Sequence, residues 1–198
     1  MATPFDKVLA LNYAFGTIDQ PAPQEATDPA DIDRAHKLVI EEVNELFSAK
    51  TRADTADGVA DILVVADGML ARIGYDANSI EHILDGLDED LEMLDAFVAG
   101  QFKENIIKTL LNIKAKALLC AHTLGINSMN AFNIVHENNM SKLCPTEEDA
   151  DATIQLYAEQ GRVTRKYRAG EFWVVREGGP KDKFLKNHKW TPPNLNDL

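Results

Sequence analysis

The stretch Ile40-Glu41-Glu42-Val43-Asn44-Glu45-Leu46, followed after a short interval by Asp57-Gly58-Val59-Ala60-Asp61, decides the fold of this chain. Glu42 and Glu45 are three residues apart and Glu41 and Glu45 are four apart, so on a helix their carboxylates project over about one turn of surface. No basic residue lies among them, so they repel one another and destabilise the helix. The flanking valine and leucine residues predict that this helix packs against another one.

The second acidic group stands on the next predicted helix. Asp57 and Asp61 are four residues apart and share a helical face. The link at residues 51–54 is short enough for the two helices to pack antiparallel, which would bring both acidic groups to one place. Converging carboxylates need cations between them, and hard oxygen ligands suit Mg²⁺, with Mn²⁺ as a possible substitute. The alternative is that each acidic run is a solvated helix face.

The rest of the chain predicts a mainly α-helical fold, a helical bundle with a small C-terminal β-hairpin. Apolar residues recur at helical spacing through most of the sequence. The predicted helices cover about residues 5–15, 28–53, 54–73, 78–98, 106–124, 127–139 and 146–160. Beyond Gly161 the pattern alternates, which predicts a two-stranded hairpin and then an extended tail. We therefore expect a helical domain over 1–160 and a hairpin with its tail over 161–198.

Composition restricts the classes of partner and the compartment. The 198 residues carry 32 acids and 20 bases, a net charge of -12. This balance argues against nucleic acid and anionic membranes as partners, because both need clustered positive charge. Cys120 and Cys144 match no metal or redox spacing, which favours a reducing compartment. No apolar run approaches the roughly 20 residues of a membrane span, so we expect a soluble, cytoplasmic protein.

A third group of polar residues lies at the predicted end of the helix over 127–139. Asn139, Ser141 and Lys142 offer an amide, a hydroxyl and a cationic amine, which suit phosphate oxygens. From composition alone, a capped helix end with an exposed lysine is the simpler interpretation.

Three of these segments resemble motifs of one enzyme superfamily. Residues 40–46 resemble the EExxE motif of the all-α NTP pyrophosphohydrolases, which include MazG, dimeric dUTPases and phosphoribosyl-ATP pyrophosphohydrolase. Residues 57–61 stand where that superfamily has its second motif, ExxD. Residues 135–143 resemble the VHxSNMSKL signature of the phosphoribosyl-ATP-pyrophosphohydrolase-like branch, which is common in bacteriophages. Shorter segments that also resemble this branch are Ala14-Phe15-Gly16, Phe184-Leu185-Lys186 and Trp190-Thr191-Pro192-Pro193.

The sequence departs from this pattern in two places. The first acid of ExxD falls on Gly58, so Asp57 would have to replace it as a ligand. The segment from about 75 to 120 is longer than the compact family core and is expected to add a pair of helices.

The resemblance implies a nucleotide pyrophosphohydrolase that cleaves an NTP or dNTP into the NMP and pyrophosphate, acting in dNTP metabolism. The implied Mg²⁺ ligands are Glu42, Glu45, Asp57 and Asp61. Glu41 would bind a further ion or orient the attacking water, and Asn139 and Lys142 would bind phosphate oxygens. Bound ions would hold the triphosphate and lower the pKa of a bound water.

Two other functions remain open. One is phosphoribosyl-ATP hydrolysis in histidine biosynthesis. The other is a helical interaction module without catalysis, which Gly58 in a ligand position favours. The superfamily also implies a homodimer or homotetramer and, for a phage-encoded protein, location in the host cytoplasm.

Overall fold

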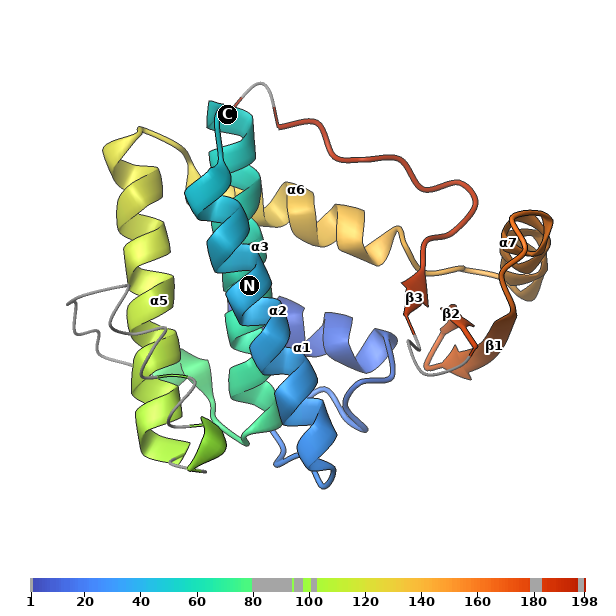
Figure 1. Ribbon diagram of the computed structural model, residues 1–198, viewed down its shortest axis with the longest axis horizontal. Helices are drawn as coiled ribbons and strands as arrows, with labels where there is room; N and C mark the ends of the chain where they lie inside the picture. Colours follow the sequence, from blue (N-terminus) through green and yellow to red (C-terminus); the bar gives the residue numbers. More distant parts are fainter. Residues whose placement is uncertain (1, 80–93, 95–97, 101–102, 179–182, 196–197) are drawn as a thin grey trace. The chain divides into compact units, whose positions relative to one another are not determined.

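The computed structural model describes residues 2–79, 94, 98–100, 103–178, 183–195 and 198. Within them the chain is mainly helical, as predicted, with a small antiparallel sheet near the C-terminus (Figure 1). No helix in this described part is long and apolar enough to cross a membrane. Most of the helix predicted over 78–98 lies outside the described residues.

The chain forms two compact units. The first comprises Met1–Leu9, Ala22–Val135 and Asn194–Leu198, and the second comprises Ala10–Pro21 and His136–Pro193. We call them the helical unit and the sheet unit, and describe each by itself.

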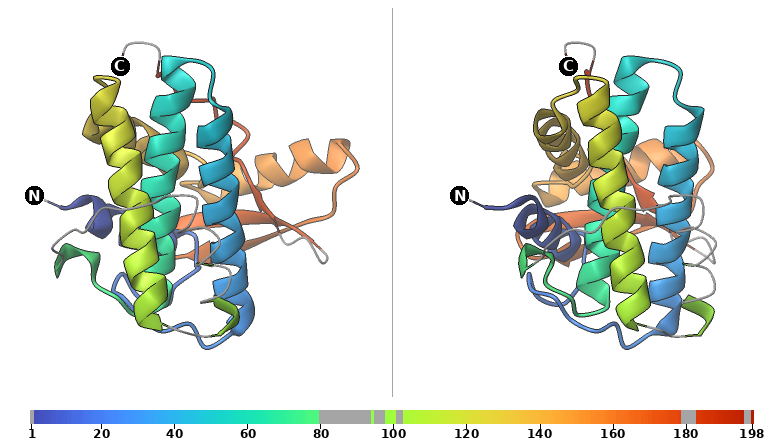
Figure 2. Two further views of the ribbon diagram at one scale, coloured as in Figure 1. Left: turned by 60° about the vertical axis from the view of Figure 1, so that its left-hand side comes forward. Right: turned by 90° about the vertical axis from the view of Figure 1, so that its left-hand side faces the viewer.

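Six α-helices are present in the described residues, together with the 3₁₀ turn η1 (Ala77–Ser79). The helices are α1 (Pro4–Ala14), α2 (Pro29–Ser48), α3 (Arg52–Arg72), α5 (Lys103–Thr123), α6 (Ser128–Met140) and α7 (Glu147–Glu159). In the helical unit, α2, α3 and α5 lie side by side, with α3 next to both of the others (Figures 1 and 2).

Local capping explains where these helices begin. The Asp28 side chain accepts a hydrogen bond from the amide of Ala30, with Pro29 in the first turn of α2, as predicted. Helix α3 begins at Arg52, two residues before the predicted start at Asp54, and its N-cap is Thr51. Thr51 and Asp54 form a capping box in which each side chain accepts a hydrogen bond from the other's amide at 3.0 Å.

The core of the helical unit is built around α3, most of which is buried. Because its apolar residues extend around more than one face, α3 can pack on α2 and on α5 at once. Fully buried large side chains include Val39, Val43, Val59, Ile62, Met69, Leu70, Leu110 and Ile113.

The sheet unit contains β1 (Thr164–Ala169), β2 (Phe172–Glu177) and β3 (Phe184–Leu185), in the order β1-β2-β3. The predicted hairpin corresponds to β1 and β2, which pair antiparallel from Thr164 opposite Glu177 to Ala169 opposite Phe172. The short strand β3 adds a third antiparallel partner that the sequence did not reveal. Helix α7 begins at the predicted N-cap, Thr146, and packs on β1 and β2.

Candidate functional site

Helices α2 and α3 pack tightly against each other at Gly58. The chain reverses direction at Ala49-Lys50-Thr51, so the two helices pack antiparallel (Figure 2). A Cβ atom added at Gly58 would lie 3.2 Å from both the Cα and the Cβ of Leu46. Real Cβ atoms rarely have contacts this short, so glycine is what permits this approach of the two helices.

This packing gives a physical reason for the missing acid in the second motif. Position 58 is buried against α2, where a carboxylate would find neither space nor water. Asp57 and Asp61, by contrast, are only half-buried. Within the second motif, α3 therefore presents the carboxylates of Asp57 and Asp61.

The five acids of α2 and α3 come into one neighbourhood. Glu41 and Glu45 are exposed, and Glu42 is half-buried. The pKa of Glu42 is raised to about 8, chiefly by burial and then by the carboxylates of Asp61, Glu45, Glu41 and Asp57, in that order of effect. Acids of both α2 and α3 therefore contribute to the raised pKa of the same carboxyl group, that of Glu42.

These carboxylates do not form a ready-made metal cage. Within the described residues, no three Asp, Glu, His or Cys side chains lie close enough together to hold one ion. The donor set nevertheless suits a hard divalent cation, because it consists of carboxylate oxygens whose mutual repulsion such an ion would offset. Because Glu45 is exposed, its side chain has room to turn toward a shared ion.

The two candidate phosphate-binding residues lie in the sheet unit and contact each other. Lys142 Nζ donates a hydrogen bond of 2.5 Å to Asn139 Oδ1. Asn139 is buried in the last turn of α6, while Lys142 is half-buried just beyond it. Ser141, also considered for phosphate, donates from Oγ to the carbonyl of Asn138 at 2.7 Å and caps the helix end.

The C-terminal segment fixes the backbone around these residues. The amide of Asn187 donates to the carbonyl of Lys142 at 3.0 Å. Asn138 donates to the carbonyl of Thr191 at 2.7 Å and accepts from the Trp190 indole at 3.1 Å. This role was not predicted from the sequence, although the resemblance of these separate segments to one enzyme branch was a signal.

The N-terminal segment completes the same cluster. The Tyr167 hydroxyl donates to the carbonyl of Phe15 at 3.0 Å, and the rings of Phe15 and Phe184 meet edge to face with centroids 4.7 Å apart. Both rings pack with Leu143 in one apolar core. Three segments, around Phe15, around Tyr167 and over 184–191, therefore pack around the end of α6.

A buried ion pair on α3 also escaped the sequence analysis. Asp67 is 1% exposed and pairs with Lys114 of α5, which is 13% exposed. Burial raises the pKa of Asp67, and the adjacent ammonium lowers it in part. The available signal was a single acid inside the apolar run from Ile62 to Leu70.

The fold and the site together define a mainly helical protein with mutually repelling carboxylates on two packed helices. No family model matches the chain, and no solved structure matches it. The chain is similar to uncharacterized protein L479 of Acanthamoeba polyphaga mimivirus. The two are 24% identical over an alignment 212 residues long, which covers 86% of this chain and 84% of that protein.

Proposed function

We propose that this protein is a magnesium-dependent nucleoside triphosphate pyrophosphohydrolase with the all-α fold of that superfamily. It would hydrolyse an NTP or dNTP to the NMP and pyrophosphate. The observation that carries the proposal is the raised pKa of Glu42, to which acids of both α2 and α3 contribute. Such a concentration of like charge on two packed helices is costly without a cation to bind.

Glu42, Glu45, Asp57 and Asp61 are the proposed ligands. A bound Mg²⁺ ion supplies charge neutralisation for the triphosphate and a lower pKa for a coordinated water. Glu42 sits among the other acids, so its proton must leave before it can serve as a ligand. Metal affinity should therefore increase with pH.

Glu41 is proposed to orient the attacking water. Its carboxylate is exposed, so it can accept a hydrogen bond from a water molecule in front of the ligands. Attack of that water on phosphorus breaks the anhydride bond between the α- and β-phosphates, and the leaving group is pyrophosphate.

Asn139 and Lys142 are proposed to bind phosphate oxygens. Lys142 already donates to a side-chain oxygen, that of Asn139, and a phosphate oxygen is a stronger acceptor for the same ammonium. The amide of Asn187 holds the backbone carbonyl of Lys142, so this residue would lose little conformational freedom on binding.

The decisive experiment is a substrate panel of all common NTPs and dNTPs, incubated with the full chain and Mg²⁺ or Mn²⁺. We expect metal-dependent release of NMP and pyrophosphate in equal amounts from at least one nucleotide. Glu42→Gln should abolish this release, while Glu104→Gln, which changes an exposed acid of α5, should not. Release of NDP and phosphate, or no turnover with either metal, would reject the proposal.

A non-catalytic helical module is the second candidate. Gly58 in a ligand position and the lack of a preformed cage in the described residues favour it. Mn²⁺ binding separates the two candidates, because a module without catalysis has no need for the ion. A chain that binds neither Mn²⁺ nor nucleotide would support the module.

We also propose a homodimer or homotetramer. Large apolar side chains are exposed on the described helices of the helical unit, including Leu38 (45%), Phe47 (59%) and Leu119 (52%). Their burial between copies would remove this surface from water. Light scattering at micromolar concentration should give at least twice the monomer mass of 21.9 kDa.

A further inference from the structure

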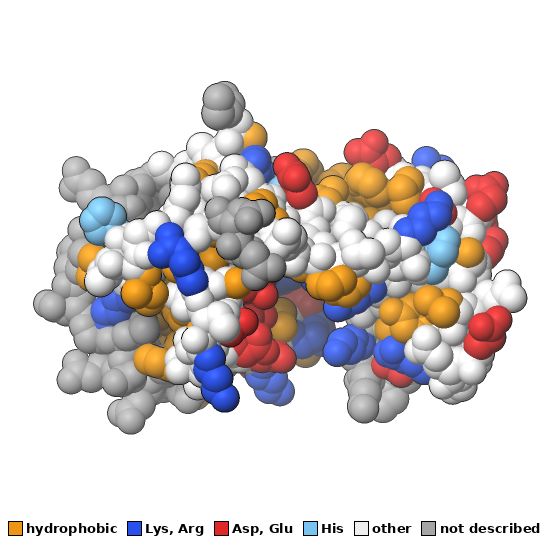
Figure 3. Space-filling model, turned by 90° about the horizontal axis from the view of Figure 1, so that it is seen from above, with side chains coloured by type: hydrophobic (Ala, Val, Ile, Leu, Met, Phe, Trp, Pro, Cys, Tyr) orange, Lys and Arg blue, Asp and Glu red, His pale blue; other side chains and the backbone are white. Residues whose placement is uncertain are grey.

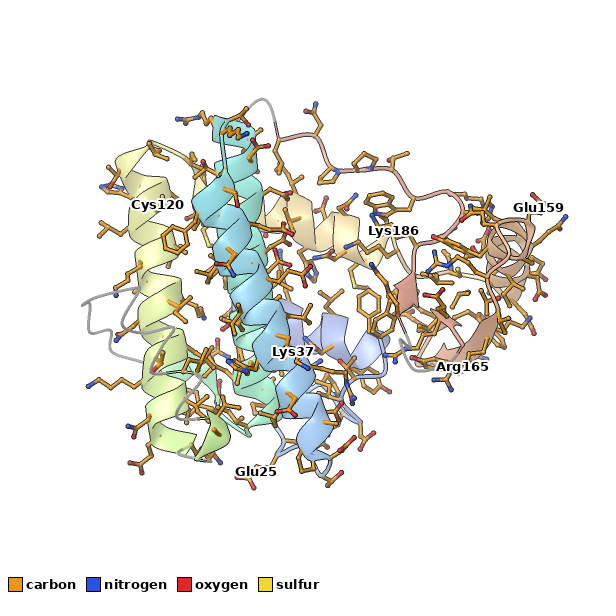
Figure 4. The ribbon with its side chains drawn as sticks, viewed as in Figure 1. Glu25, Lys37, Cys120, Glu159, Arg165 and Lys186 are labelled. Atoms are coloured by element: carbon orange, nitrogen blue, oxygen red, sulfur yellow. The ribbon has the colours of Figure 1, made fainter. Side chains whose placement is uncertain are left out.

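A cavity of about 340 Å³ lies at the open end of the α2–α3 pair, where α2 begins and α3 ends. Its apolar walls include Ile32, Ile73, Val98 and Ile106, and Glu25, labelled in Figure 4, lies at the same end. Ile32 and Glu42 are ten positions apart on α2, which corresponds to about 15 Å along a helix. The cavity is therefore separate from the group of acids.

Arg72 supplies the main polar group of the cavity. It is half-buried in the last turn of α3, and burial lowers the pKa of its guanidinium, with Asp31 offsetting this in part. Its hydrogen bond within the described residues runs from Nη1 to the carbonyl of Gly68 at 2.7 Å. A guanidinium carries five N–H donors, so most of its capacity remains for a molecule in the cavity.

The other charges at the cavity limit what can bind there. Lys103 forms an ion pair with Glu25 at the rim, and both side chains are largely exposed. Asp33 also lines the cavity and is exposed. The two rim carboxylates repel ligands with several negative charges. Among the described residues that line the cavity, Lys103 is paired with Glu25, which leaves Arg72 to bind one anionic group.

We propose that this cavity binds a small organic monocarboxylate. The carboxylate would accept two parallel hydrogen bonds from Arg72, the geometry that guanidinium groups favour. The apolar body would lie against Ile32, Ile73 and Ile106. The volume is at the lower end of the range for small-molecule sites, which suits a ligand of this size. This inference does not depend on the proposed function.

Calorimetric titration of the full chain with benzoate tests the proposal, with benzyl alcohol as the neutral analogue and inorganic phosphate as the compact, more highly charged anion. We expect saturable binding of benzoate and at least tenfold weaker binding of both others. Arg72→Gln should weaken benzoate binding at least tenfold. Arg168→Gln, which changes an exposed arginine of the sheet unit, should leave it unchanged.

Ile32→Trp gives a second variant that keeps Arg72. Its larger side chain should fill part of the cavity from a half-buried position and weaken benzoate binding at least tenfold. No saturable benzoate binding by the parent chain would overturn the proposal. So would equal binding by parent and Ile32→Trp, or phosphate binding as tight as benzoate.

Discussion

The two units differ sharply in how their charges are balanced. The sheet unit contains ten Lys and Arg residues and ten Asp and Glu residues, whereas the helical unit contains ten bases and 22 acids. The entire net charge of -12 therefore belongs to the helical unit. A whole-chain charge thus hides one neutral unit and one strongly anionic unit.

The acids and bases of the sheet unit pair with one another locally. Arg162 donates two hydrogen bonds to Glu177, at 3.0 and 2.9 Å. Lys166 pairs with Glu147 and Asp151, each on α7. Figure 3 shows acidic and basic side chains interspersed over this part of the molecule. In the helical unit the acids on α2 and α3 instead raise the pKa of Glu42, so we propose that an external cation binds there.

Removing the buried ammonium of Lys114 from the helical unit should have the largest effect on stability. Lys114→Met leaves Asp67 buried without its partner, and we expect a loss of about 3–5 kcal/mol in the free energy of unfolding. Lys166→Met in the sheet unit should lower the free energy of unfolding far less, because its acidic partners are more than half exposed. Urea denaturation measures both. Equal losses in the two variants would show that burial does not decide how much each ion pair contributes to stability.

Metal affinity should depend on the helical unit alone. Glu45→Gln removes a proposed ligand, so we expect turnover to fall at least about 100-fold and Mn²⁺ binding to weaken. Lys142→Ala should lower substrate affinity or turnover and leave Mn²⁺ affinity of the free protein unchanged. Paramagnetic resonance measures the bound Mn²⁺. Identical Mn²⁺ affinity in both variants would refute the ligand assignment.

A smaller effect is expected at Asp57. If this residue replaces the acid missing at Gly58, Asp57→Asn should lower turnover at least about tenfold, comparable to Asp61→Asn, since each factor of ten is about 1.4 kcal/mol. The thermal midpoint should not fall, because the change relieves repulsion around Glu42. A fully active Asp57→Asn variant beside an inactive Asp61→Asn variant would make Asp57 a surface acid.

The smallest effect concerns stability against pH without metal. Folded Glu42 keeps its proton up to about pH 8, whereas the ordinary glutamate pKa is 4.5. The unfolded state therefore binds fewer protons between these values, and stability falls as pH rises through this window. In metal-free protein at high pH, Glu42→Gln should raise the thermal midpoint by at least about 2 °C, because the neutral amide carries no buried charge.

Near pH 4 the parent and Glu42→Gln should melt together, because Glu42 is protonated in both states there. Adding Mg²⁺ should stabilise the parent more at high pH than at low pH. A constant difference at every pH would mean that Glu42 does not titrate in this window.

Features set by local chemistry could be predicted from the sequence. The cap at Asp28-Pro29, the cap at Thr146 and the hairpin after Gly161 depend on neighbouring residues, and the structure confirms them. The spacing of the acids likewise predicted that they would share helix faces. The roles of these acids stay predictions.

Features set by distant contacts could not be predicted. Nothing near Gly58 in the sequence indicates that Leu46 lies within 3.2 Å of its missing side chain. The pairing of Asp67 with Lys114 joins residues 47 positions apart. The attachment of the C-terminal segment to Lys142 likewise depends on the backbone of Asn187, whose hydrogen bonding no sequence pattern specifies.

The hydrogen bond from Tyr167 to Phe15 has a consequence for synthesis of the chain. Its two residues are 152 positions apart, so at ordinary translation rates Phe15 is made roughly 8–30 s before its partner. During that interval Ala14 and Phe15 lack the strands that cover them. A nascent chain arrested before Tyr167 should therefore expose this segment to proteases and to chaperones, and completion of the sheet should end that exposure.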